Sequence, residues 1–496
     1  MRIIRKYHSV KYLLKNHKIK LLLSILIIFC LFSTYYVFRV KLPRKKFASN
    51  LNVLLISIDT LRADHMGIYD YSRNTTPNID KWAKDSVVFK KAMTLVPMTY
   101  PSFSMLMTGL DPFQTRIFSN YQNPYAISNN TNTLAKILAK NGYHIGVFMS
   151  TIALNATTNM VSDTKDFNYL NYMYDPEKEA YVDSRKDYET LIDNSLNWIG
   201  KNKGKKFFLW VHLMDPHAPY DPPEQLKCKF DKKQCSSIKN KAMQELINQT
   251  YKTMECQQKV SKDTLDLYKT LYDGEIAEAD ILAGKILNKL KNEGLDKNTL
   301  IILYGDHGEG FDHDYNFNHR GALYNSETRI PLIIHYPLIT SSVKTTDRLV
   351  TNTDILPTIL DLLSIPRNKY TFDGKSFSYV FRSKLLTNIL PEQRDYIIMT
   401  NDQLTKFAIY DGRYKFIYST NSACKFNDQK EEFYDLKEDP QESKNIIVEK
   451  KDLAEEFKRK LLNYLSVYNL PSANDEKDKK GQESTEIIEK LKSVGY

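Results

Sequence analysis

Cysteine is scarce in this sequence, with five residues among 496. No pair has the Cys-x-x-Cys spacing of a structural zinc site, which excludes that class of metal centre. Cys30 falls inside an apolar run, so at most two disulfides remain for the other four, Cys228, Cys235, Cys256 and Cys424. The favoured pair is Cys228 with Cys235, which bracket a lysine-rich stretch, and four free thiols are the alternative. Internal repeats are also lacking.

Acidic residues are missing from the first 46 positions, which hold twelve Lys and Arg. Because the whole chain has a formal charge of +11, the rest of it sums to −1. The positive charge therefore belongs to the N-terminal end and is not spread over the folded part. A basic face for DNA or RNA is not indicated, and nucleic acid is excluded as a partner.

Charge of either sign is absent from Leu21 to Phe38, a run of about 18 residues that is just long enough for a transmembrane helix. A cleaved signal peptide is the alternative, but its apolar core would be shorter, and the run ends in Thr34-Tyr35-Tyr36-Val37-Phe38, a poor cleavage site. We expect a cytoplasmic basic segment at 1–18, a single-pass membrane anchor at 19–38 and a linker at 39–50. The remainder would be extracytoplasmic, because long domains are translocated regardless of flanking charge.

Strands that alternate with helices make up most of the sequence after the linker. Apolar strands are expected at 52–58, 144–149, 207–213, 299–304 and 330–336. Helices are expected at 133–141, 191–200, 263–293 and 353–363, and a further one opens at Thr76-Pro77. This alternation predicts an α/β fold, with a large, mostly parallel sheet sandwiched by helices over a domain at 51–365. The chain length suits one such domain with an appendage.

The pattern changes after residue 365. Short antiparallel strands are expected at 407–409, 414–418 and 432–434, with Asp411-Gly412 as a turn, followed by a helix at 451–465. They predict a small C-terminal α+β lobe, an antiparallel-sheet subdomain at 366–470. The last residues, 471–496, form a charged, largely polar tail.

Polar clusters follow three of the expected strands. They begin at Asp59, Asp215 and Asp306, directly after the strands at 52–58, 207–213 and 299–304. Ligands of open α/β sheets bind outside the carboxyl ends of the strands. A single such cluster would be interpreted as a capped turn. Three at one edge of the same sheet predict a site.

A fourth segment adds a hydroxyl, that of Thr99, in a loop just before an expected helix. A Thr at such a place is far more often a helix cap than a nucleophile. The neighbouring clusters favour the nucleophile, because Asp59, Asp306 and His307 offer two carboxylates and an imidazole to one divalent metal ion, Ca²⁺, Mn²⁺ or Zn²⁺. Thr99 would complete the metal site. A metal-bound hydroxyl loses its proton more easily and becomes an active nucleophile.

Two histidines are expected around the anionic group under attack. His217 and His319 would donate to its oxygens or protonate the leaving alcohol, and they complete the catalytic set with Thr99. Arg62 is expected either to neutralise charge or only to brace its loop. Weaker candidates, expected behind these side chains, are His212, His313 and Glu309.

These motifs, in this order, resemble the sulfatase family of the alkaline phosphatase superfamily. The resemblance covers residues 51 to 465 and is carried by Asn52-Val-Leu-Leu-Ile-Ser-Ile-Asp59-Thr-Leu-Arg, Thr99-Tyr-Pro-Ser-Phe-Ser, Asp215-Pro-His-Ala-Pro-Tyr, Tyr272-Asp-Gly-Glu, Asp306-His-Gly-Glu-Gly, Arg329-Ile-Pro-Leu, Asp411-Gly-Arg-Tyr and Phe433-Tyr-Asp-Leu. It implies a metal-dependent ester hydrolase. The residues that it implies as metal ligands are Asp59, Asp306 and His307, with Thr99 at the nucleophile position and His217 and His319 around the substrate oxyanion.

The chain departs from the family pattern at the nucleophile. Sulfatases carry Cys or Ser where Thr99 stands and convert it to formylglycine within Cys/Ser-x-Pro-x-Arg. Thr cannot form that aldehyde, Phe103 replaces the Arg, and Thr60 stands where the family often has a second Asp. A Thr nucleophile is similar instead to that of phosphoethanolamine and lipoteichoic-acid transferases, which implies a phosphothreonine formed with Mn²⁺ or Zn²⁺.

We therefore expect a membrane-anchored, metal-dependent hydrolase that cleaves a sulfuric or phosphoric ester through Thr99. The first alternative is a phosphoethanolamine-type phosphotransferase or phosphodiesterase acting on lipid or glycan. The second is a non-catalytic binding protein with a retained fold, which the intact site residues disfavour. The expected partners are an anionic ester of a glycan, a lipid or a small molecule, and the membrane.

Overall fold

The computed structural model describes residues 21–22, 24–26, 29, 50–120, 127–151, 159–161, 166–169, 174–175, 180–181, 185–232, 260–313, 315–316, 319, 321–339, 344–381, 394–420 and 429–468. The chain divides into two units, Met1–Ser49 and Asn50–Tyr496, and the second contains the sheets of the described fold. No helix in the described ranges has the length and apolar character needed to cross a membrane. Most of the predicted anchor at 19–38, and the whole tail at 471–496, lie outside the described residues.

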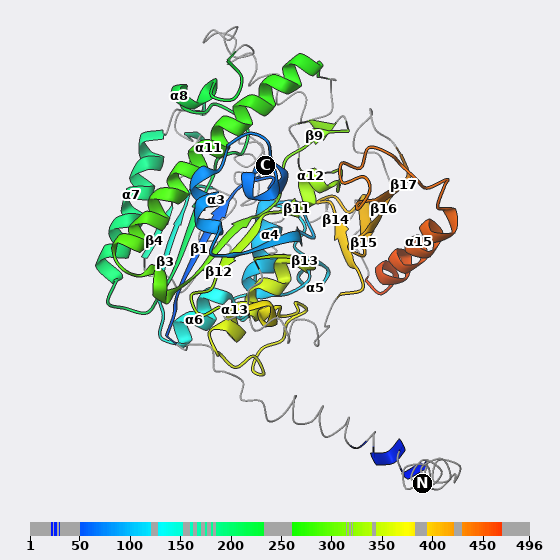
Figure 1. Cartoon of the computed structure of the whole chain (residues 1–496), viewed down its shortest axis with the longest axis horizontal. Coiled ribbons are helices and arrows are strands. Elements are labelled where there is room, and N and C mark those ends of the chain that lie inside the picture. Colours follow the sequence, from blue (N-terminus) through cyan, green and yellow to red (C-terminus); the bar gives the residue numbers. More distant parts are fainter. Residues whose placement is uncertain are drawn as a thin grey trace, which may run out of the picture. The chain divides into compact units, whose positions relative to one another are not determined.

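A large mixed sheet forms the centre of the second unit (Figure 1). Within the described ranges it has nine strands in the order β11-β2-β12-β8-β1-β7-β3-β4, with β13 paired to β2. The bounds are β1 Asn52–Ile58, β2 Val87–Met93, β3 His144–Met149, β4 Asp166–Tyr169, β7 Phe207–Leu213, β8 Thr299–Gly305, β11 Arg329–Ile330, β12 Leu332–His335 and β13 Thr345–Thr351. Strands β8, β1, β7, β3 and β4 are mutually parallel, whereas β11 and β12 run antiparallel to their neighbours.

Helices cover both faces of this sheet, and its central strands are therefore buried on both sides. Successive side chains of a strand point to opposite faces. Leu54 and Ile56 of β1 join one apolar cluster with α3 (Pro77–Ala83), α7 (Arg185–Asn202) and α11 (Lys262–Asn292). On the other face α4 (Thr99–Thr108) packs against Trp210 of β7 through Phe103, and α6 (Leu134–Lys140) and α13 (Ile355–Leu362) pack against α4. The predicted α/β architecture is confirmed.

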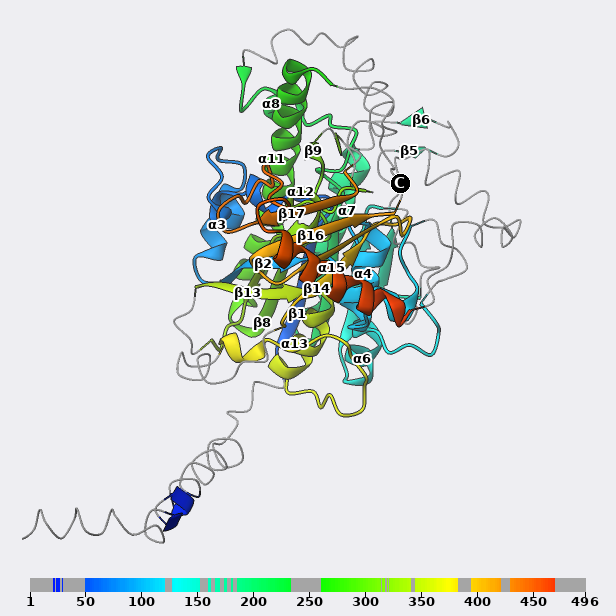
Figure 2. The same cartoon turned by 90° about the vertical axis from the view of Figure 1, so that its right-hand side faces the viewer.

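A second, antiparallel sheet lies beside the large one. Its order is β14 (Ile397–Thr400), β15 (Lys406–Tyr410), β16 (Tyr414–Ser419) and β17 (Glu431–Asp435). Figure 2 views the unit from the side of this sheet, with α15 (Lys451–Ser466) packed against β15 and β16. An apolar cluster that includes Met98 and Met105 of the large domain and Phe433 of β17 joins the two sheets.

Shorter elements complete the described fold. They are α5 (Pro112–Thr115), α8 (Glu224–Lys227), α12 (Asn325–Thr328), the strand pair β5 (Tyr174–Asp175) and β6 (Ala180–Tyr181), and the pair β9 (Phe311–Asp312) and β10 (Tyr315–Asn316). One predicted strand, 330–336, is wrong as a single element. It is divided at Pro331, which has no N–H for the ladder, so β11 ends before it and β12 begins after it. Cys228 is a free thiol, and Cys235 lies outside the described residues.

A buried carboxyl group in α12 makes stability depend on pH. Burial raises the pKa of Glu327 from 4.5 to about 8, so the folded protein keeps a proton that the unfolded chain releases near its ordinary pKa. Raising the pH from 4.5 to about 8 should therefore lower the free energy of unfolding, by up to about 1.4 kcal/mol per pH unit. We expect Glu327→Gln, which has no titrating proton, to flatten this slope in urea titrations across the window. An equally steep slope in that variant would contradict the assignment.

Candidate active site

The carboxyl ends of three central strands meet at one edge of the sheet. Strand β1 lies between β7 and β8 and is parallel to both, with Ile58 in register with Leu213 on one side and Gly305 on the other. The Asp59 N–H continues the ladder by donating to the Leu213 carbonyl at 2.9 Å. The polar segments that follow the three strands therefore emerge side by side, as predicted.

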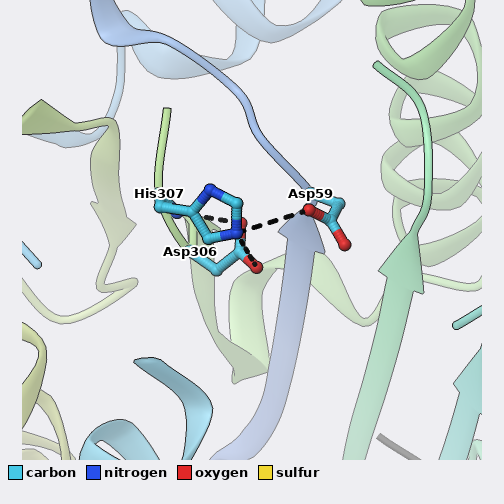
Figure 3. A group of neighbouring side chains, drawn as sticks. All are labelled: Asp59, Asp306 and His307. Carbon is cyan, nitrogen blue, oxygen red and sulfur yellow. Dashed lines mark hydrogen bonds and ion pairs between the residues drawn. The ribbon is translucent and has the colours of Figure 1, made fainter. Parts of the chain in front are cut away.

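Asp59, Asp306 and His307 form a fully buried cluster at this edge. One ligand atom from each lies within 4.8 Å of the others. The His307 Nε2 atom is 3.7 Å from Asp59 Oδ1 and 3.5 Å from Asp306 Oδ2. Figure 3 shows the two carboxylates and the imidazole pointing toward one another from the ends of β1 and β8. The sequence predicted this set of three.

The backbone around the cluster fixes Asp306. Thr60 has a left-handed φ of +50°, unusual for a β-branched residue, and its N–H donates to Asp306 Oδ1 at 3.1 Å. The His307 N–H donates to the same oxygen at 2.9 Å. Gly308 is required next, because a Cβ there would collide with the Ser326 carbonyl oxygen. Asp306 Oδ2 is left buried, without a hydrogen-bond partner among the described residues.

The carboxylate oxygens of Asp59 and Asp306 and the imidazole nitrogen of His307 are suitable ligands for a divalent cation. His307 Nδ1 donates to the Gly308 carbonyl at 2.9 Å, so the lone pair of a neutral ring is on Nε2. Burial and the nearby His319 lower the pKa of His307 to about 3, which keeps the ring neutral. Burial and the Asp59 charge raise the pKa of Asp306 well above its usual range. Two adjacent buried carboxylates are costly to ionise together, and a cation between them would remove that cost.

Thr99 is the first residue of α4, with Met98 as the N-cap. Its Oγ1 lies 3.4 Å from His307 Nε2, and Thr99 is fully buried. The hydroxyl therefore faces the carboxylate cluster. No side-chain cap hydrogen bond is present at this helix end, so Thr99 does not act as the cap.

His217 and His319 lie beside the cluster. The His319 ring centroid is 4.3 Å from that of His307 and 5.4 Å from that of His217. His217 Nδ1 donates to the Ala218 carbonyl at 2.7 Å. Burial lowers the pKa of both rings, that of His319 to about 4, so both are neutral near pH 7. The structure thus brings His217 and His319 together with Thr99 and the three predicted metal ligands.

Arg62 braces its loop and does not face the cluster. Its guanidinium binds both oxygens of Asp64, at 2.9 and 2.7 Å, and Asp312 Oδ2 at 2.9 Å. Of the two roles left open for Arg62, the structure favours the brace. His313 lies apart from the site, stacked on Tyr324 with ring centroids 3.8 Å apart.

Glu309 and His212 lie behind the predicted site, as expected. Glu309 Oε1 is 3.3 Å from His319 Nδ1. The His212 Nε2 atom is 3.5 Å from Asp59 Oδ2. Each therefore contacts one of the predicted site residues.

Two residues that hold the site together lie in the sequence motifs but are not among the predicted site residues. The Ser102 hydroxyl donates to the Asp306 carbonyl at 2.8 Å, which fixes α4 against the metal-site loop. The Tyr272 hydroxyl donates to the Thr60 carbonyl at 2.7 Å and accepts from the Arg62 N–H at 3.0 Å. Ser102 carries a usable signal, since it lies one helical turn from Thr99. Tyr272 opens the motif Tyr272-Asp-Gly-Glu, but the sequence does not show that it contacts Thr60 and Arg62, because α11 is distant from β1 in sequence.

The geometry places the Thr99 hydroxyl beside a buried cluster of two carboxylates and an imidazole. A cation held by two carboxylates and an imidazole, with neutral histidines at the rim, suits the attack of Thr99 on a negatively charged ester.

The sequence matches two family models and several curated proteins. A family model described as Sulfatase matches residues 51–365, and one described as N-sulphoglucosamine sulphohydrolase, C-terminal, matches residues 312–467. Similar curated proteins include an arylsulfatase of Clostridium perfringens, 25% identical over 477 residues that cover 83% of this chain and 92% of the relative. Another is a Delta 4,5-hexuronate-2-O-sulfatase of Bacteroides thetaiotaomicron, 24% identical over 434 residues, or 81% and 85% of the two chains.

A solved structure of similar fold is the phosphonate monoester hydrolase of Agrobacterium radiobacter. The TM-score is 0.62 at 20% sequence identity, over 84% of this chain and 96% of that one. At this identity the likeness concerns the fold alone.

Proposed function

This chain belongs to the sulfatase family and is an ester hydrolase, and we propose that it cleaves an anionic sulfuric or phosphoric ester with Thr99 as the nucleophile. One observation carries the proposal. The Thr99 hydroxyl lies 3.4 Å from His307 Nε2, inside the buried cluster that His307 forms with Asp59 and Asp306. A hydroxyl in that position is next to the place where a bound anion would be held.

The proposed reaction has two displacements. Thr99 Oγ1 forms a bond to the sulfur or phosphorus while the bond to the alcohol oxygen breaks, and water then attacks the adduct and releases the free Thr99 hydroxyl with sulfate or phosphate. A divalent cation held by Asp59, Asp306 and His307 would polarise the ester and lower the pKa of the hydroxyl.

The proton lost from Thr99 has to end on the departing alcohol. Because His217 Nδ1 is engaged by the Ala218 carbonyl, Nε2 is the nitrogen through which that ring exchanges a proton. The His319 ring lies next to both the His217 and the His307 ring, and His319 is the second candidate for this transfer. We assign the proton transfer to these two rings together.

Sulfate esters of glycans are the substrate class that we propose first. Two curated relatives are named as sulfatases, one of them for a hexuronate 2-O-sulfate. The domain limits at 51–365 and 366–470, the membrane anchor at 19–38 and an extracytoplasmic location remain part of the proposal, on the sequence reasoning alone.

Phosphoryl transfer or phosphodiester cleavage is the second candidate, and the nucleophile favours it. Thr99 cannot become formylglycine, and Phe103 occupies the place of the family's Arg. Its ring packs against those of Trp210 and His212, with ring centroids 5.0 and 5.2 Å away. A Thr hydroxyl is suited to form a phosphothreonine.

A substrate panel tests the proposal. We expect the purified full chain with Mn²⁺ or Ca²⁺ to release alcohol from an aryl sulfate or an aryl phosphomonoester faster than from an aryl phosphodiester, measured as initial rates. Faster release from the phosphodiester would favour the second candidate. No release from any of the three with any cation would contradict the assignment as an ester hydrolase of this mechanism.

A further inference from the structure

A chain of buried polar groups runs along the face of the sheet that α4 covers. It consists of Trp210, Ser57 and His212, all fully buried. Ser57 and His212 are register partners in the adjacent parallel strands β1 and β7, and Trp210 is two residues before His212 on the same face. The Trp210 Nε1–H donates to Ser57 Oγ at 2.8 Å, and Ser57 Oγ lies 2.9 Å from His212 Nδ1.

The direction of these hydrogen bonds follows from the donors available. An indole N–H can only donate, so Ser57 Oγ accepts from Trp210. The single hydrogen of the Ser57 hydroxyl then needs an acceptor, and within the described residues His212 Nδ1 is the one in reach. A hydrogen on Nδ1 would leave the buried Ser57 hydrogen unpaired, at a cost of about 1–3 kcal/mol. Nδ1 is therefore unprotonated, and the neutral ring carries its hydrogen on Nε2.

His212 Nε2 makes no hydrogen bond within the described residues, and Asp59 lies next to it. Nε2 lies 3.5 Å from Asp59 Oδ2, and a shift of a few tenths of an ångström would give a normal hydrogen bond. The other oxygen, Asp59 Oδ1, lies 3.7 Å from His307 Nε2. The two oxygens of Asp59 thus face different groups. Phe103 packs edge-on against the His212 ring at 5.2 Å and holds its plane.

We propose that His212 is a positioning residue, which holds Asp59 Oδ2 so that Asp59 offers only Oδ1 to the cation, and that Trp210 and Ser57 set the tautomer that makes this possible. The inference rests on the proposed function, because it takes Asp59 as a metal ligand. Groups that hydrogen-bond metal ligands fix the orientation of those ligands, and their removal costs about 10- to 100-fold in metal affinity.

Neutron diffraction from the metal-free full chain tests the tautomer without any activity measurement. We expect deuterium on His212 Nε2 and none on Nδ1, with the Ser57 hydroxyl deuterium directed at Nδ1. Deuterium on Nδ1 would overturn the proposal.

Mn²⁺ titration calorimetry tests the consequence for binding. We expect His212→Phe, which keeps a ring but removes the donor, to raise the dissociation constant for Mn²⁺ about 10- to 100-fold. Ser57→Ala should raise it in the same direction, since it frees the tautomer. The matched control is Ser150→Ala, which removes a buried hydroxyl that donates to the His212 main-chain carbonyl at 3.1 Å and should leave Mn²⁺ affinity unchanged.

The outcomes distinguish a failure of the role proposed for His212 from a failure of the proposed metal-dependent function. Unchanged affinity in both His212→Phe and Ser57→Ala would overturn the role of His212 and leave the metal site standing. A wild-type chain that binds no Mn²⁺, Ca²⁺ or Zn²⁺ would contradict the proposed function itself, and this role with it. If His212→Phe does not fold, Ser57→Ala and the neutron map decide the matter.

Discussion

Thr99→Ala is expected to abolish turnover, lowering kcat by about 10⁴-fold or more. Without the hydroxyl there is no oxygen to form the covalent adduct, and water would have to attack the ester from a site not built for it. The fold should persist, because Thr99 caps no helix end and its hydroxyl contacts the His307 ring rather than the backbone of another element. Steady-state kinetics and Mn²⁺ calorimetry on the same preparation measure both effects, with Mn²⁺ binding largely retained.

Two further variants serve as controls for Thr99→Ala. Thr99→Ser keeps a hydroxyl and should keep part of the activity. Thr108→Ala removes another buried hydroxyl of the same helix, one that donates to the Ser104 carbonyl at 2.7 Å, and should leave kcat near that of the wild type. Wild-type turnover by Thr99→Ala would refute the nucleophile assignment.

Removal of the divalent cation is the second change that we expect to have a large effect on the rate of hydrolysis. A chelator should reduce hydrolysis to background, and added Mn²⁺, Ca²⁺ or Zn²⁺ should restore it. Asp306→Asn should weaken Mn²⁺ binding by at least about 100-fold, because a neutral amide replaces one of two buried carboxylates. Its side-chain oxygen can still accept from the Thr60 and His307 N–H groups, so the loop should keep its shape.

The control for this substitution is Asp312→Asn. That carboxylate pairs with Arg62 at 2.9 Å and does not belong to the cluster. We expect a small loss of stability in thermal melts and unchanged Mn²⁺ affinity. Activity that survives exhaustive chelation would contradict a metal-dependent mechanism.

The central strands could be predicted because they are apolar and end in polar clusters. β1, β3 and β7 begin and end where the apolar runs do. Their parallel pairing then places Asp59, Asp306 and His307 at one edge, which is a consequence of topology and not of sequence distance. This is why the clustering of these three side chains could be expected from the sequence.

The outer strands could not be predicted from apolar runs. β2 contains Lys90 and Lys91 in its middle, and both are only partly buried. β13 begins with exposed or half-buried polar residues, Thr345–Arg348, because it pairs only with β2. Neither shows the continuous apolar pattern of a central strand.

The supporting contacts of the site could not be predicted from the sequence either. Ser57 is a polar residue inside an apolar strand, and its meaning depends on the register that sets it beside His212. The sequence is compatible with two roles for Arg62, and its contacts to Asp64 and Asp312 favour the structural one. The roles of Thr99, His217 and His319 in the reaction stay predictions.

Intact-protein and peptide mass spectrometry of the full chain, quenched in acid during turnover, tests the central claim most directly. Thr99 as the nucleophile predicts a mass increase of one sulfuryl or phosphoryl group, located on Thr99 and absent from Thr99→Ala. The identity of the group also tells sulfate from phosphate ester cleavage. An adduct on another residue, or unmodified Thr99 during turnover of every substrate that the enzyme accepts, would contradict it.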